Sequence, residues 1–251
     1  MNDALHYLKL DPYFRQFNHR DLTFALMYAF SENFILAISH DELVHMKGSM
    51  LGMAPGDDPA KFATIRAFYV YMMTMPGKKL NMMGTEIGQF NEWHYEYSLD
   101  WHLLQHPQFQ KHHAFFQALN NFYLSRSELW EQDDSWEGFQ WVEANDANGN
   151  TLIYLRRDKK KRELLIAVNF SPSDRVGYQI GVPVAGTYEV LFNSDDEAFG
   201  GQGRGSKSPL KTKPVPAHDF KQSLVVDLPP LSGLILRCSR KNPVRAKKVE
   251  P

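Results

Sequence analysis

Two short segments of the sequence gather the side chains that could do chemistry. The first, Ser39-His40-Asp41-Glu42, directly follows the apolar run 34–38. A carboxylate and an imidazole side by side at a strand end can hydrogen-bond two neighbouring sugar hydroxyls, and a buried carboxylate can stabilise an oxocarbenium-like transition state. His40 and Asp41 could equally cap the strand and the next helix. They form a candidate site with a purely structural alternative.

The second segment, residues 83–93, again comes just after a predicted strand. Glu86 and Gln89 offer hydrogen bonds and Trp93 offers an apolar face, which together make the mixture that sugars favour. The alternative is a long loop with helix caps and a packed tryptophan. Because functional groups of parallel sheets collect at the carboxyl ends of strands, we expect both segments to lie at one edge.

The elements that would position these segments alternate along the first half of the chain. Apolar spacing predicts helices over residues 22–31, 61–75 and 109–124, and strands over 34–38 and 79–83. The first strand is apolar on both faces, which suits a buried parallel sheet. The order of helices and strands predicts a parallel α/β arrangement.

Two strands are too few to bury both faces of a parallel sheet. We therefore expect further strands to come from a part of the parallel α/β barrel or sheet that is missing here, or from another chain. Without them, helix faces that carry Phe68, Met72 and Phe116 should be exposed and should promote association.

From about residue 136 the apolar residues alternate in short runs separated by turns, which predicts an antiparallel β-sandwich. A long mobile loop is expected over 200–217. The predicted domains are 1–130, 131–240 and a disordered tail over 241–251. The seven predicted strands are 138–143, 151–156, 163–169, 175–181, 186–193, 223–228 and 233–238.

Composition excludes several classes of function. The 251 residues carry 28 basic and 29 acidic side chains, so no large field would attract nucleic acid or an anionic membrane. The longest apolar stretch, 67–73, is far shorter than the ~20 residues that span a bilayer. The single cysteine, Cys238, favours a reducing, cytoplasmic compartment. His40 and His45 do not have the spacing of a zinc HExxH motif, so no metal site is expected.

The motifs occur together in a specific order. The strings SENFILAISHDELVHMKGSMLGMAPGD and PGKKLNMMGTEIGQFNEWHYEYSLDWHLL are followed by LIAVNFSP and LPPLSGLIL. This order resembles the C-terminal part of bacterial 1,4-α-glucan (glycogen) branching enzymes, of the α-amylase superfamily, over residues 1–239. The resemblance implies the C-terminal portion of a (β/α)8 barrel followed by an all-β domain. By it, the chain begins after the sixth barrel strand and supplies the last two.

The resemblance also implies roles for single residues. Asp41 matches the carboxylate that stabilises the transition state, and His40 matches its hydroxyl-binding partner. Glu86 matches the acidic residue after the eighth strand, with Gln89 and Trp93 as further substrate-binding candidates. The implied reaction cleaves an α-1,4 glucan link and transfers the segment to a C6 hydroxyl, forming α-1,6 branches without metal or organic cofactor.

In the family, the nucleophile and the general acid lie upstream of this segment. A retaining transfer needs two such carboxylates about 5 Å apart, so we expect the chain alone to be inactive. The expected partners are an α-glucan and the missing N-terminal portion of the enzyme. The alternatives are another glycoside hydrolase of the superfamily and a noncatalytic α-glucan-binding fragment.

Three residues depart from the family pattern. Ala37 replaces a common proline, Met46 a usual glycine, and Thr85 an asparagine. The exchange at Met46 is expected to narrow the acceptor side, and the exchange at Thr85 removes an amide near the subsite. Both bear on donor chain length and acceptor preference.

Overall fold

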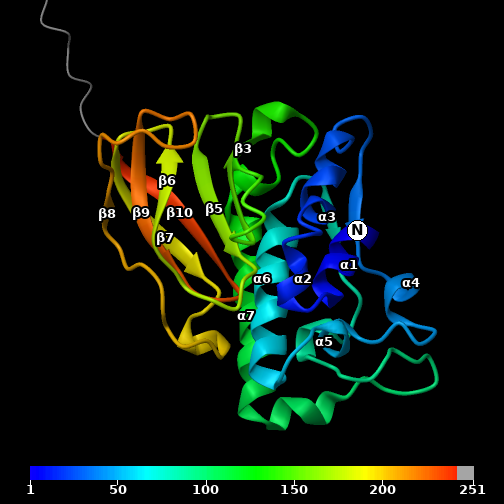
Figure 1. Ribbon diagram of the computed structural model, residues 1–251. Helices are drawn as coiled ribbons and strands as arrows, with labels where there is room; N and C mark the ends of the chain where they lie inside the picture. The colour runs from blue at the N-terminus through cyan, green and yellow to red at the C-terminus, as the bar shows by residue number, and fades with distance from the viewer. Residues whose placement is uncertain (242–251) are drawn as a thin grey trace, which may run out of the picture.

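The computed structural model describes residues 1–241 and has two parts (Figure 1). The first part consists of helices and one short pair of parallel strands, and the second part is an antiparallel β domain. This confirms the predicted fold class of a mixed part followed by an all-β part. The elements of the first part are α1 (Asn2–Lys9), α2 (Pro12–Arg15), α3 (Arg20–Thr23), η1 (Phe24–Met27), β1 (Ile35–Ala37), α4 (His40–Leu43), α5 (Met50–Met53), α6 (Asp58–Thr74), β2 (Lys78–Leu80), η2 (Thr85–Ile87), η3 (Trp101–Gln105), α7 (Pro107–Ser125), η4 (Ser127–Leu129) and η5 (Trp136–Gly138).

The long helices form where the sequence predicts them. Asp57 caps α6, because its side chain accepts a hydrogen bond from the amide of Ala60, and Pro59 stands in the first turn. No helix in the described part of the chain combines the length and the apolar character needed to cross a membrane.

The predicted helix over 22–31 is wrong in its continuity, because the structure divides the segment into α3 and η1. At the break, the carbonyl of Leu22 accepts a hydrogen bond from the hydroxyl of Tyr71 at 2.7 Å. Thr23 has φ −109° there, well away from the helical value. The helix is therefore interrupted where its backbone contacts α6, a helix distant in the sequence.

Strands β1 and β2 pair in parallel, with Ile35 opposite Lys78 and Ala37 opposite Leu80. The amide of Ile38 extends the ladder to the carbonyl of Leu80 at 2.9 Å. The prediction that the first strand is buried on both faces is wrong, since Ile35 is 61% exposed in a sheet of only two strands among the described residues. The pairing still directs the segments after both strands to one edge.

The β domain packs a six-stranded sheet, in the order β3-β4-β5-β10-β7-β8, against the pair β6-β9. All seven predicted strands are present. The prediction that residues 200–217 form a loop without a regular element is wrong in part, because the short β8 lies within them and pairs with β7. Of the predicted tail, Lys241 still belongs to β10, and residues 242–251 lie outside the described residues. The strands and the one helical turn are β3 (Phe139–Glu143), β4 (Thr151–Arg157), β5 (Glu163–Asn169), β6 (Arg175–Val182), β7 (Gly186–Asn193), η6 (Glu197–Phe199), β8 (Leu210–Lys211), β9 (Gln222–Leu228) and β10 (Ser232–Lys241).

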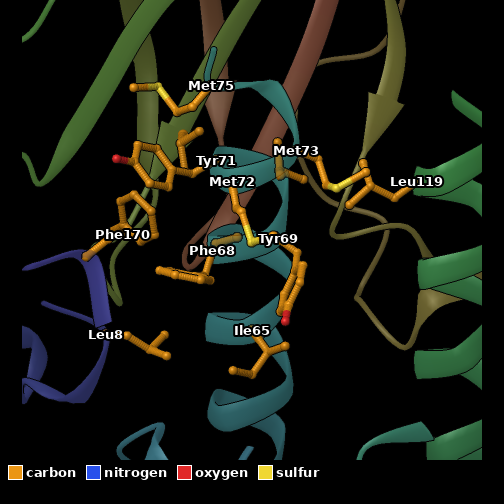
Figure 2. Packing of buried hydrophobic residues seen from close by; sticks show 14 of the residues in the cluster. Leu8, Ile65, Phe68, Tyr69, Tyr71, Met72, Met73, Met75, Leu119 and Phe170 are labelled. Atoms are coloured by element: carbon orange, nitrogen blue, oxygen red, sulfur yellow. The ribbon is translucent and has the colours of Figure 1, made fainter. Parts of the chain in front are cut away.

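Helix α6 runs between the N-terminal helices and α7 and packs on the six-stranded sheet (Figures 1 and 2). Phe68, Met72 and Phe116 are buried, so the predicted exposure of these helix faces is wrong. They belong to one apolar core that the N-terminal helices, α6, α7 and the sheet share, and the ring of Phe116 packs on that of Tyr69 of α6 with centroids 4.6 Å apart. The backbone of β10 approaches closely, because a Cβ added at Gly233 would lie 2.5 Å from Cγ1 of Val70.

Three buried arginines join the two parts. Arg66 donates from Nε to the carbonyl of Ser194 at 2.8 Å, and Arg15 donates from Nη1 to that of Phe170 at 2.8 Å. Burial lowers the pKa of Arg66 to about 10. The third, Arg156, is bonded to the carbonyls of Thr74, Leu129 and Gly138 and to the carboxylate of Asp133. Each cation is thus taken up by backbone carbonyls of the opposite part.

Candidate functional site

Helix α4 starts directly after β1, and Ser39 begins it with a capping box. The Glu42 carboxylate accepts hydrogen bonds from the amide and the hydroxyl of Ser39, both at 2.7 Å. Burial alone would raise the pKa of Glu42, but these bonds hold it below its ordinary value. Ser39 and Glu42 therefore cap α4, and the side chains of His40 and Asp41 take no part in the cap.

The side chains of His40 and Asp41 are 63% and 76% exposed. Nε2 of His40 lies 3.4 Å from Oδ1 of Asp41, so imidazole and carboxylate stand side by side. The carboxylate can accept a hydrogen bond from one sugar hydroxyl, and the imidazole N–H can donate to the adjacent one. The pair is available to a ligand that approaches from solvent.

The turn after α4 has an unusual backbone. His45 and Met46 have φ of 58° and 66°, and Gly48 has φ of 84°. Left-handed conformations at residues other than glycine persist only where the surroundings impose them. Met46 is 96% exposed, so its side chain contributes no packing to the turn. Lys47 reaches back from the turn, and its Nζ donates to the carbonyl of Asp41 at 2.5 Å.

The second segment leaves β2 and forms η2 between two left-handed glycines, Gly84 and Gly88. Helix α7 holds this turn from behind. Nε2 of His112 donates to the carbonyl of Thr85 at 2.9 Å, and Nδ1 of His113 donates to that of Glu86 at 3.3 Å. Glu86 is half-buried at the centre of the turn.

The imidazole of His112 is neutral at ordinary pH. Burial lowers its pKa to about 4, and the rings of Phe62 and Phe116 lie with centroids 5.0 Å away. The carbonyl of Thr85 can only accept, so the proton is on Nε2. Nδ1 is buried without a hydrogen-bond partner, and a second proton would have no acceptor there.

Gln89 and Trp93 belong to the loop that follows η2. The Gln89 amide is buried and bonds backbone on both sides, since Nε2 donates to the carbonyl of Asn91 and Oε1 accepts from the amide of Asp100, each at 3.2 Å. Trp93 is half-buried and lines a pocket of about 360 Å³ together with Gln89 and Tyr97. Gln89 thus organises the loop, while Trp93 faces a space that can hold a ligand.

The two segments meet at the edge remote from the β domain (Figure 1). Oε1 of Glu92 accepts a hydrogen bond from the amide of Gly48 at 2.7 Å, and the hydroxyl of Ser49 donates to the carbonyl of Phe90 at 2.9 Å. The parallel pairing of β1 and β2 therefore brings the segments into contact, as the strand ends predict.

The contact does not extend to every predicted site residue. Within residues 1–241, no hydrogen bond or ion pair joins the side chains of His40 and Asp41 to those of Glu86, Gln89 or Trp93. The described residues also contain no group of three or more His, Cys, Asp or Glu that could hold a metal ion.

Sequence reasoning missed two residues that organise the site. Glu92 has no spacing signal, because its partner Gly48 lies 44 positions away. His112 occupies one stripe of α7 with apolar residues, where it was indistinguishable from a core position. Its signal would have been a lone imidazole on an otherwise apolar helix face.

Residues 141–239 match the family of alpha amylase C-terminal all-beta domains. A 1,4-alpha-glucan branching enzyme GlgB from Cellvibrio japonicus is 45% identical over 237 residues, which cover 94% of this chain and 32% of that protein. The chain corresponds to the C-terminal portion of bacterial 1,4-alpha-glucan branching enzymes. The branching enzyme GlgB of Aquifex aeolicus is 44% identical over 238 residues, covering 94% of the chain and 38% of the relative.

The chain thus spans about a third of the length of these branching enzymes. Among solved structures, an alpha-amylase from H. orenii is 15% identical, with a TM-score of 0.57 over 96% of this chain and 47% of that one. A debranching enzyme from Nostoc punctiforme is 18% identical, with a TM-score of 0.51 over 81% of this chain and 35% of that one. At such identities the likeness concerns the fold.

Proposed function

We propose that the chain carries the closing part of the active site of a branching enzyme, which cleaves α-1,4 glucan links and forms α-1,6 branches. The observation that carries this proposal is the 45% identity to a branching enzyme over 94% of the chain, a stretch long enough to include both site segments. The exposed His40 and Asp41 at the carboxyl edge of β1 and β2 are consistent with it. The compartment proposed with this function is the cytoplasm.

In the proposed reaction, Asp41 stabilises the positive charge that develops on the sugar ring. Its carboxylate becomes effective when the glucan and the rest of the barrel exclude water around it, because a charge interaction strengthens as the local dielectric falls. His40 then holds a sugar hydroxyl beside it. Glu86 and Trp93 are proposed to contact neighbouring glucose units, with Gln89 as a support for their loop.

A single carboxylate of this kind cannot complete the transfer. One carboxylate must form the glycosyl-enzyme intermediate, and a second must protonate the leaving oxygen and then activate the C6 hydroxyl of the acceptor. By resemblance, both come from the upstream portion of the enzyme. We therefore propose that these 251 residues are inactive alone and that an upstream portion is their partner.

The test compares the chain alone with the chain coexpressed with the N-terminal portion of a branching enzyme. Loss of iodine staining and new α-1,6 linkages should appear for the pair and not for the chain alone. In the pair, Asp41→Asn should lower the rate by about 10²–10³-fold, the scale of removing one transition-state contact. New α-1,6 linkages from the chain alone would contradict the proposed inactivity, and an inactive pair would contradict the proposed function.

A noncatalytic glucan-binding role is the second candidate, favoured by the aromatic side chains around the 360 Å³ pocket. There, the ring of His94 stacks on Tyr95 with centroids 5.2 Å apart, and Trp93 and Tyr97 line the space. The test is a column that carries the immobilised wild-type chain. If this column retains linear maltooligosaccharide while the coexpressed pair forms no α-1,6 branches, glucan binding is the function. Trp93→Ala should then abolish the retention.

A further inference from the structure

The turn between α4 and α5 needs an external support. Two successive residues other than glycine, His45 and Met46, have left-handed backbone, at φ of 58° and 66°. Within the turn, the amide of Lys47 donates to the carbonyl of Val44 at 3.4 Å, and side-chain packing adds nothing, since Met46 is 96% exposed. The groups that bond this turn must therefore account for its shape.

The support comes from the second site segment. The Glu92 carboxylate accepts a hydrogen bond from the amide of Gly48 at 2.7 Å, a distance typical of charge-assisted bonds. This bond, together with the amide of Met46 and the nearby imidazole of His45, holds the pKa of the Glu92 carboxyl below its ordinary value. The carboxylate is thus anionic at neutral pH, and it faces the amide groups that the left-handed turn exposes.

The turn is itself hydrogen-bonded to Asp41, the candidate catalytic residue. Lys47 lies between the left-handed residues and Gly48, and its Nζ donates to the carbonyl of Asp41 at 2.5 Å. The amide of Asp41 donates in turn to Oγ of Ser39 at 3.2 Å. A continuous series of bonds therefore connects Glu92, the turn over 45–48 and the backbone of Asp41.

We propose that Glu92 is a positioning residue: its carboxylate fixes the left-handed turn at 45–48, and the turn fixes Asp41 through Lys47. This inference rests on the proposed function in so far as Asp41 acts on glucan. Glu92 itself does not touch the reacting atoms in this proposal. It couples the segment after β2 to the segment after β1.

The first test measures amide hydrogen exchange by NMR in the 251-residue chain. Glu92→Ala should speed the exchange of the Gly48 amide by about tenfold or more, and that of the Asp41 amide by a smaller factor. Glu92→Gln, which retains one acceptor oxygen, should give intermediate values. Lys47→Met should speed exchange at Asp41 and leave Gly48 unchanged, because it breaks only the second link.

Glu96→Ala is the matched control. Glu96 lies in the same loop, where its carboxylate accepts a hydrogen bond from the hydroxyl of Tyr95 at 3.1 Å and lies 3.9 Å from Nδ1 of His94. It should change neither amide. Unchanged exchange at Gly48 in Glu92→Ala would overturn the proposal, as would faster exchange at Gly48 with no change at Asp41.

The second test measures branching kinetics in the coexpressed pair. Glu92→Ala should lower kcat by about 10- to 100-fold with KM within about threefold, and Glu92→Gln should recover part of the loss. An unchanged kcat would overturn the positioning role. An inactive wild-type pair would count against the proposed function alone, because the amide exchange of the 251-residue chain decides the role of Glu92 independently of activity.

Discussion

Where α6 packs on the β domain, the side chains of Arg66 and Arg156 are buried and hydrogen-bonded to backbone carbonyls, whereas along the edge after β1 and β2 the side chains of His40 and Asp41 are exposed and sparsely bonded. Arg156 has four partners in the buried contact. At the edge, Asp41 has an exposed carboxylate, and the neighbouring turn is held by its own bond from the amide of Lys47 to the carbonyl of Val44 and by one bond each from the side chains of Lys47 and Glu92. The side chain of Arg156 is therefore fixed by more bonds than the side chains at the edge.

This difference assigns the two regions different tasks. The continuous core from α6 into the six-stranded sheet resists local opening, since opening would expose apolar side chains and leave buried cations unpaired. At the edge, the side chains of His40 and Asp41 are accessible to solvent and do not cap the helix. The proposed site, which would bind glucan and face an upstream portion of the enzyme, requires this accessibility.

The largest expected effect tests the buried contact. Arg156→Met should lower the free energy of unfolding by about 3–5 kcal/mol, because it removes the donor of the carbonyls of Thr74, Leu129 and Gly138 and leaves the carboxylate of Asp133 with Lys78 alone, at 3.3 Å. Urea unfolding followed by circular dichroism measures the loss.

Arg157→Met is the control on the same strand. Arg157 is bonded to the carboxylate of Glu163 and the amide oxygen of Gln140, both at 2.6 Å, and is only partly buried. Its loss should cost about 1 kcal/mol or less. If the two variants were equally stable, the buried contact would not be the more strongly determined region.

The next effect in size concerns the anchor of η2 and depends on pH. The pKa of His112 is about 4 in the folded chain and about 6.5 unfolded, so between these values the unfolded chain binds a proton that the folded chain does not. Stability contributed by neutral His112 is therefore complete above pH 6.5 and is lost as the pH falls. The loss should reach about 2 kcal/mol at pH 5.

Urea unfolding at pH 7 and pH 5 measures this loss. His112→Gln keeps a donor for the carbonyl of Thr85 but cannot bind the proton, so its stability should depend less on pH. His106→Gln, at an exposed position before α7, should retain the wild-type dependence. Equal pH dependence in all three proteins would contradict the assignment of a neutral, buried His112.

The sequence predicts the β domain well because each strand carries its own signal. Alternating apolar residues and intervening turn residues locate strands such as Thr151–Arg157 and Glu163–Asn169 to within about a residue. Local signals also locate α6, through its cap at Asp57. The two residues of β8 carry no such pattern, because their pairing with β7 depends on chain folding rather than on periodicity.

The site is predictable only in part for the same reason. A strand end followed by His40 and Asp41 is a local feature, and the structure places both residues where it indicates. The support of the site is not local: Glu92 bonds Gly48 across 44 positions, and His112 bonds Thr85 across 27. Neither separation corresponds to the repeat of a helix or a strand, so these contacts depend on the fold and cannot be predicted from a sequence pattern.

The smallest expected effect is a gain in stability at the edge. Met46→Gly should raise the free energy of unfolding by about 0.5–1 kcal/mol, because glycine adopts φ of 66° without the clash of Cβ, and this relief exceeds the entropy that glycine adds to the unfolded chain. The exposed Met46 side chain removes no packing when lost. Met27→Gly, at an exposed position in η1, should instead lower stability by about 0.5–1 kcal/mol. Opposite signs in urea unfolding would show that the backbone of the edge is strained at Met46. A loss in both variants would show that Met46 carries no such strain and that the edge is as relaxed as the rest of the surface.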